Sequence, residues 1–225
     1  MTKPAARASY GMALALLCAV PSAFPADMQL QNSFPNGALA DVYIGPYTAL
    51  IDGVSTLVIC DDYSTETYVG PHWTAKVSTF PTLANTKFGV ANETTYKEVA
   101  WLSLQLLNPS ITCPISSNNC AGDIQFAIWQ AFDNPNPFNR LSAYSLTNDL
   151  SNANYWLTEA AKASNYDSVD LTGFAIYTAD PLGAAQEFIV KTPESSALAL
   201  LGIDLSAVGG LFLLFRRRSL NHHST

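Results

Sequence analysis

The spacing of apolar positions changes twice along the chain, and the order of these changes predicts the fold. β-branched and aromatic residues gather in short runs in the first and last parts of the chain, with turn residues between neighbouring runs. We expect strands over residues 42–47, 54–60, 73–79, 171–178 and 186–190. The turn sequences Ile51-Asp52-Gly53 and Asp180-Pro181-Leu182-Gly183 join the first two and the last two of these strands.

Between these strands apolar residues recur every three or four positions, which is the period of a helix. The pattern predicts helices over about 96–107, 122–133 and 148–163. Gln125 then lies in the first turn of the second helix. Strands, then helices, then strands again predict one α+β domain with a mainly antiparallel sheet and about three inserted helices.

The N-terminal residues have the composition of a secretory signal peptide. Two basic residues, an apolar stretch and a zone of small residues follow one another within residues 1–26, which we expect to direct export. The basic residues are Lys3 and Arg7, and the apolar stretch covers 12–20. Cys18 leaves a lipoprotein open as an alternative.

The C-terminal residues 192–219 combine three features. A Pro193-Glu194 step is followed by an apolar span over 197–215, at the lower limit of length for crossing a bilayer. A basic cluster then holds the end of the span on the cytoplasmic side; it consists of Arg216, Arg217 and Arg218. This combination resembles the PEP-CTERM sorting signal of Gram-negative bacteria.

The resemblance implies a processing enzyme of the exosortase type that acts near Pro193 and Glu194. It also implies transient anchoring in the inner membrane and delivery to the cell surface or exopolysaccharide matrix. An ordinary C-terminal membrane anchor is the alternative. In either case the folded part, residues 27–191, lies outside the cytoplasm and is long enough for one domain with its own core.

The balance of charge excludes one class of partner. The chain has 11 basic and 18 acidic residues. Within 27–191 there are 6 basic and 16 acidic residues, a net charge of −10. A domain this acidic has no electrostatic attraction for phosphate backbones, so we expect no nucleic-acid partner.

The cysteines of the folded part divide into a pair and a single thiol. Cys113 and Cys120 flank a turn-rich loop of six residues that can return on itself. We expect them to form a disulfide in an oxidising compartment. Cys60, at the end of a predicted strand, is then left without a partner.

Two segments carry the candidate chemistry. One is Val58-Ile59-Cys60-Asp61-Asp62-Tyr63, and the other is Asp123-Ile124-Gln125-Phe126-Ala127-Ile128-Trp129. Together they resemble the thioester domains of bacterial surface adhesins. The resemblance implies a thioester between the Cys60 thiol and the Gln125 side chain, a thioester-domain-like fold, no cofactor, and covalent capture of an amine-bearing surface or matrix partner.

Physical chemistry makes such a bond feasible without a second protein. A thiolate held against an amide can displace ammonia, because well-oriented groups reach effective molarities of roughly 10⁵–10⁸ M. We expect free N–H groups at the start of the second helix to stabilise the thiolate and the oxyanion. We expect shielding from water by Tyr63, Phe126 and Trp129. The capture would happen once per chain, so we do not expect an enzyme.

Two neighbouring carboxylates, Asp61 and Asp62, oppose this chemistry, because they should raise the pKa of Cys60. With Asp52 they are also candidate calcium ligands, but they lack the alternating oxygen ligands of a calcium loop. No His and Cys residues have zinc-ligand spacing. We therefore expect no metal site.

Other interpretations of the same residues remain open. Cys60 could be a structural thiol buried in the core, and Gln125 could cap its own helix. A cysteine hydrolase would pair Cys60 with His72. A non-covalent matrix or carbohydrate-binding module would use exposed aromatic rings that stack on sugars, for which the candidates are Tyr43, Tyr47 and Trp73.

Overall fold

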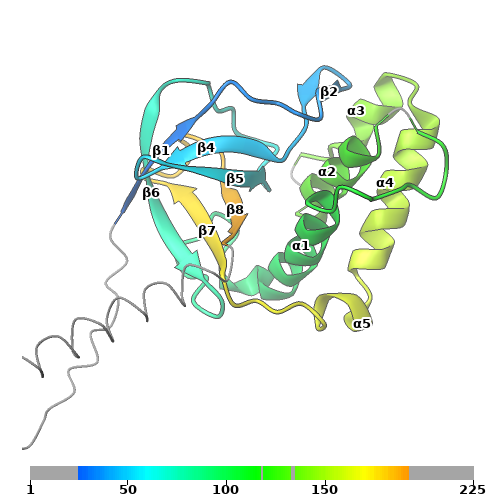
Figure 1. The fold of residues 1–225 in the computed structure, drawn as a ribbon. Helices are drawn as coiled ribbons and strands as arrows, with labels where there is room; N and C mark the ends of the chain where they lie inside the picture. The colour runs from blue at the N-terminus through cyan, green and yellow to red at the C-terminus, as the bar shows by residue number, and fades with distance from the viewer. Residues whose placement is uncertain (1–24, 118, 133–134, 193–225) are drawn as a thin grey trace, which may run out of the picture.

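The computed structural model describes residues 25–117, 119–132 and 135–192. Six strands form a closed antiparallel barrel in the order β1-β4-β5-β8-β7-β6. These strands are β1 (Ala26–Leu30), β4 (Tyr47–Ile51), β5 (Val54–Cys60), β6 (His72–Thr79), β7 (Phe174–Ala179) and β8 (Phe188–Lys191). Figure 1 shows the barrel and the helices as two halves lying side by side. The predicted α+β class and the antiparallel sheet are confirmed.

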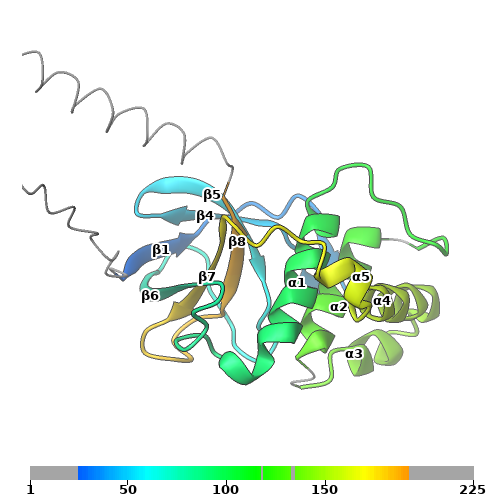
Figure 2. The ribbon, with the colours of Figure 1, turned by 90° about the horizontal axis from the view of Figure 1, so that it is seen from below.

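All helices of the described chain are inserted between β6 and β7. They are α1 (Glu93–Leu106), α2 (Cys120–Ala131), α3 (Phe138–Ala143), α4 (Thr147–Ala160) and α5 (Ala163–Tyr166), preceded by the 3₁₀ turn Val90–Asn92. The three predicted helices correspond to α1, α2 and α4. The short α3 and α5 were not predicted. Figures 1 and 2 both show α1 and α2 nearer the barrel than α4.

The first strand pair differs from the expectation. Val42–Tyr43 forms β3, which pairs with β2 (Ala38–Leu39) in a small hairpin outside the barrel. The partner of β5 is instead β4, with Ile51 opposite Val54. Both turn residues between them have positive φ, which is the geometry of a tight two-residue hairpin turn. The strand must therefore run up to Asp52, and the predicted strand over 42–47 was placed too early.

A strand that the sequence analysis did not predict opens the barrel. β1 begins at Ala26, the last residue of the segment assigned to the signal peptide, and pairs with both β4 and β6. The remaining terminal features, including Pro193, Glu194 and Arg216 to Arg218, lie outside the described residues. Among the described residues, no helix combines the length and apolar character needed to cross a bilayer.

The buried side chains form two hydrophobic clusters. The first, called the barrel cluster here, fills the barrel and extends to residues of α2, α3 and α4, and the second joins other strand residues to α1, α2 and α4. Strand β5 contributes to both, because successive side chains of a strand point to opposite faces. Val58 and Cys60 lie in the barrel cluster, and Ile59 lies in the second cluster. Helix α2 is buried over residues 122–129 and also contributes to both clusters, as a central helix should.

Candidate thioester site and its pocket

Cys60 is the last residue of β5 and is fully buried in the barrel cluster. It pairs with Phe188 of the neighbouring strand β8. Its Sγ donates a hydrogen bond of 3.2 Å to the backbone carbonyl of Asp62. It carries a free thiol. The structure therefore places the predicted odd cysteine on a rigid strand end, away from solvent.

Gln125 lies on α2, and its side chain meets the end of β5. The side-chain Nε2 donates a 2.7 Å hydrogen bond to the backbone carbonyl of Cys60, and both residues are 0% exposed. The other amide atom, Oε1, has no hydrogen-bond partner among the described residues. The fold thus brings together two residues that are 65 positions apart and leaves the amide carbonyl of one of them unsatisfied.

Gly45 allows the amide to occupy this position. A Cβ at residue 45 would lie 2.6 Å from Gln125 Oε1 and 3.2 Å from the Tyr47 ring. The contact of 2.6 Å is shorter than Cβ atoms make in proteins, so a larger residue would displace the amide. Gly45 immediately precedes Pro46, and nothing in the sequence pattern distinguishes it from other turn glycines.

The expected role of the helix start is not supported. Helix α2 begins at Cys120, and the side chain of Asn119 caps it by accepting a 2.9 Å hydrogen bond from the Gly122 N–H. Gln125 therefore lies in the second turn, beyond the free N–H groups of the first. The prediction that Gln125 lies in the first turn was wrong, because the helix starts two residues earlier than its periodicity indicated.

The electrostatic surroundings keep the Cys60 thiol protonated. Burial, together with the charges of Asp61 and Asp62, raises its pKa well above the ordinary value. The Trp129 indole and the backbone of Asp62 act in the opposite direction. Within the described ranges the indole N–H makes no hydrogen bond of ordinary geometry. The predicted direction of the pKa shift is confirmed.

Asp62 is neutralised by a cation. Lys87 Nζ lies 2.5 Å from Asp62 Oδ1, which also accepts a 3.0 Å bond from the Ser64 N–H. Burial acts to raise the pKa of Asp62, but the hydrogen bond and charge of Lys87 hold it below the usual range. The carboxylate is thus ionised and held by the lysine, which weakens its opposition to a thiolate at Cys60.

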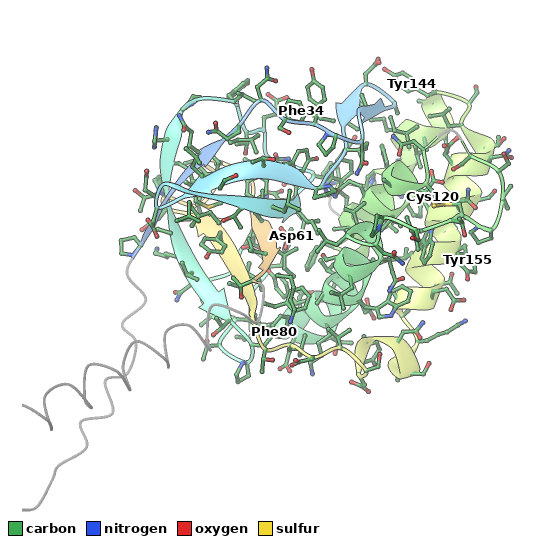
Figure 3. The ribbon with its side chains drawn as sticks, viewed as in Figure 1. Phe34, Asp61, Phe80, Cys120, Tyr144 and Tyr155 are labelled. Carbon is green, nitrogen blue, oxygen red and sulfur yellow. A yellow bond between two sulfur atoms is a disulfide. The ribbon has the colours of Figure 1, made fainter. Side chains whose placement is uncertain are left out.

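Asp61, unlike Asp62, is not paired with a cation among the described residues. Its side chain is fully buried, and neither carboxyl oxygen has a hydrogen-bond partner among the described residues. Burial first, and then the charge of Glu187, raise its pKa well above the ordinary value. Glu187 accepts bonds of 2.6 Å each from the Tyr96 hydroxyl and the Lys87 N–H. Asp61 therefore holds its proton more firmly than an ordinary aspartate, which limits the charge that it places beside the thiol. Figure 3 shows it at the junction of the barrel and the helices.

The three predicted shielding residues form one aromatic group, but only two of them line the pocket. The Tyr63 and Trp129 rings lie 5.1 Å apart, and Phe126 packs edge-on to Trp129 at 5.2 Å. Tyr63 and Trp129 line a pocket, whereas Phe126 is completely buried beneath them. The wall of the pocket also includes Tyr47 and Phe188.

This pocket has a volume of about 660 Å³ and opens between the β2–β3 hairpin, the loop after β5 and α2. Its inner wall consists of the aromatic side chains nearest the Cys60–Gln125 pair: Tyr47, Tyr63, Trp129 and Phe188. Its mouth carries further rings and charges: Phe34, Tyr43, Tyr68, Asp41, Glu66 and Arg140. A molecule in the pocket would therefore approach the buried pair through an aromatic layer.

The predicted disulfide is confirmed. Cys113 and Cys120 are bonded, with their Cα atoms 5.5 Å apart. Because Cys120 is the first residue of α2, the bond ties the preceding loop to the start of the helix that carries Gln125.

No protein-family model matches the sequence, and no curated protein matches it. Among solved structures, the fold is similar to the pilus-presented adhesin Spy0125 (Cpa), with a TM-score of 0.49 and 13% sequence identity. The match covers 76% of this chain and 49% of that one, so this chain spans about half the length of the adhesin structure. We therefore base the proposals below on the contacts within this chain.

The residues of the alternative hydrolase and calcium sites do not lie together. His72 is largely exposed on β6, where its Nδ1 lies 2.9 Å from Asp27, while Cys60 is buried in the barrel; the two form no pair. Asp52 lies in the β4–β5 turn, at the opposite end of β5 from Asp61. In the described ranges no three His, Cys, Asp or Glu side chains are placed to hold a metal ion.

The aromatic residues expected to stack on sugars are only partly available. Tyr43 is 59% exposed, but Tyr47 is 6% exposed and belongs to the inner wall of the pocket. Trp73 packs against Phe188 inside the barrel, with ring centroids 6.1 Å apart. Strand alternation turns these two side chains inward, which their composition alone did not indicate.

Proposed function

We propose that this chain is an exported surface or matrix protein that captures amine-bearing partners through a thioester between Cys60 and Gln125. The observation that carries the proposal is the buried contact between the Gln125 amide and the end of β5. A free thiol and an amide with an unsatisfied carbonyl at one dry position are the two reactants that the bond needs.

Formation of the bond would proceed by acyl transfer. The sulfur of Cys60 adds to the side-chain carbonyl carbon of Gln125, the C–N bond breaks, and the nitrogen leaves as ammonia with the proton of the thiol. The Trp129 indole and the Asp62 backbone favour the thiolate, and Lys87 neutralises one of the two neighbouring carboxylates, Asp62. Contact between the groups supplies the effective concentration that the weakly acidic thiol requires.

Capture would release the Cys60 thiol and join the Gln125 side chain to the partner. A primary amine of the partner attacks the same carbonyl carbon, the C–S bond breaks, and Cys60 regains its proton. The product is an amide that joins Gln125 to the partner. Burial under Tyr63 and Trp129 limits attack by water, which would otherwise hydrolyse the thioester.

The test is the intact mass of protein exported with its disulfide formed. We expect a mass lower by one ammonia, and addition of exactly one methylamine on incubation. The Cys60→Ala and Gln125→Ala variants should show neither change. A wild-type mass equal to that of the unmodified sequence, in folded and disulfide-bonded protein, would contradict the proposal.

A further inference from the structure

A column of aromatic rings leads from the surface into the pocket. The Tyr43 ring stacks on Phe34 with centroids 4.1 Å apart and planes 13° from parallel. Phe34 meets Tyr47 edge-on at 6.0 Å, and Tyr47 meets Phe188 edge-on at 6.3 Å. One face of the Tyr43 ring packs on Phe34, and the residue is 59% exposed, so a flat ring held by this contact is available at the mouth.

The charged groups of the mouth are two carboxylates and one guanidinium. Glu66 and Asp41 are exposed there, and each accepts a bond from a tyrosine hydroxyl, that of Tyr68 for Glu66 and that of Tyr144 for Asp41. A carboxylate has about four acceptor positions, so these single bonds leave capacity for a ligand. The one basic residue of the lining, Arg140, already donates a 2.6 Å bond to the backbone carbonyl of Ala40.

These features discriminate among classes of occupant. A peptide that adds as a strand needs a long open sheet edge, which the closed barrel lacks; the strands of the β2–β3 hairpin have only two residues each. An anionic ligand would meet the carboxylates of the mouth and a domain of net charge −10. A sugar ring presents one apolar C–H face to an aromatic ring and hydroxyl groups to carboxylates and amides. A positively charged sugar also matches the charge of the mouth.

We propose that this pocket binds, non-covalently, an oligosaccharide that carries free amino groups. Tyr43 and Tyr68 supply exposed rings for the sugar faces, and Asp41 and Glu66 accept hydrogen bonds from its ammonium and hydroxyl groups. The pocket volume lies within the roughly 300–1,000 Å³ of ordinary ligand sites. This binding stands whether or not the thioester forms. Where the thioester does form, the same pocket would hold an amine close to it.

The test uses the exported chain with Cys60→Ala, so that only non-covalent binding is measured. The probes are short β-1,4-linked oligomers of glucosamine, N-acetylglucosamine and glucose, which differ only at the second carbon, and an oligomer of a uronic acid. Calorimetric titration should show the glucosamine oligomer binding about tenfold more tightly than the two uncharged ones, with no binding of the uronic acid. Failure of this binding leaves the mass test of the thioester untouched, so the two proposals fail separately.

Substitutions of residues at the mouth test whether the oligosaccharide binds in this pocket. Tyr43→Ala and Tyr68→Ala should each weaken binding of the glucosamine oligomer about tenfold, since both rings are exposed and their loss leaves the core intact. Glu66→Gln should weaken the glucosamine oligomer but not the glucose oligomer. The control is Tyr155→Ala, because Tyr155 is 42% exposed on α4, on the outer side of the helices in Figure 3. Equal binding of the charged and uncharged oligomers, no binding of any of them, or unchanged binding in both tyrosine variants would overturn the proposal.

Discussion

At the scale of single residues, the site depends on side chains whose importance the sequence pattern does not reveal. Cys60 and Gln125 could be selected from their local motifs. Gly45 and Lys87 could not, since they act through neighbours that only the fold brings close: Gly45 leaves room for the amide, and Lys87 binds Asp62. A turn glycine and an isolated lysine carry no periodic signal.

The contact at Gly45 gives a prediction about the position of the amide. Gly45→Ala should prevent loss of ammonia and lower the free energy of unfolding by about 1–3 kcal/mol, because the new Cβ would overlap Gln125 Oε1. Intact mass and denaturant unfolding measure the two effects. In a Gln125→Ala background the overlap is absent, so the same substitution should then cost much less. Equal costs in both backgrounds would show that the amide does not lie where we describe it.

At the scale of elements, the helices were predicted well and the strands less well. Helices α1, α2 and α4 carry regular apolar periods over three turns or more, and each was found within a few residues of its bounds. Strand β1 has only five residues and directly follows the apolar N-terminal segment, so its pattern was hidden. The start of α2 was missed because the disulfide loop, through Asn119 and Cys120, supplies its cap and first residue.

A buried acid between α2 and α4 predicts a dependence of stability on pH. Asp123 accepts a 3.1 Å bond from Asn152 of α4. Burial, with the charge of Asp149, raises the pKa of Asp123 from 3.8 to about 7. A raised acid pKa means that the folded state holds a proton that the unfolded state has lost. Stability should therefore fall by up to about 1.4 kcal/mol per pH unit between about pH 4 and pH 7, and level off above.

The Asp123→Asn variant isolates the contribution of Asp123 to the pH dependence of stability, because an amide keeps the hydrogen bond with Asn152 but does not titrate. Denaturant unfolding of wild type and variant from pH 4 to pH 8 gives the comparison. When the free energy of unfolding is plotted against pH, the difference between variant and wild type should grow with pH and then become constant. Parallel curves would mean that the pKa of Asp123 is the same in the folded and the unfolded chain.

The disulfide predicts an effect on both stability and chemistry. Replacing Cys113 and Cys120 together by serine should lower the free energy of unfolding by about 2–3 kcal/mol, as expected for a loop of this length. It should also reduce the fraction of chains that lose ammonia, because the loop fixes the first turn of the helix that carries Gln125. Denaturant unfolding and intact mass are the measurements. Full loss of ammonia in the doubly substituted chain would show that α2 needs no support from the loop.

At the scale of the whole molecule, the charge of the domain predicts how fast partners are captured. With 6 basic and 16 acidic residues in 27–191, the domain attracts cationic amines before contact. The second-order rate of methylamine addition should therefore fall as added salt shortens the screening length from about 30 Å to about 3 Å. Mass spectrometry of timed samples follows the reaction. An uncharged nucleophile such as hydroxylamine, tested in parallel, should show no such fall.

The two-residue turn between β4 and β5 determines which side chains of β5, the strand that ends at Cys60, point into the barrel. With Ile51 opposite Val54, every second side chain of β5 enters the barrel, and the sulfur is one of them. One extra amino acid in this hairpin that shifted the pairing would exchange the two faces, so that Ile59 entered the barrel and Cys60 turned to the helices. The length of this hairpin, far from the site at the other end of β5, thus constrains the position of the Cys60 sulfur.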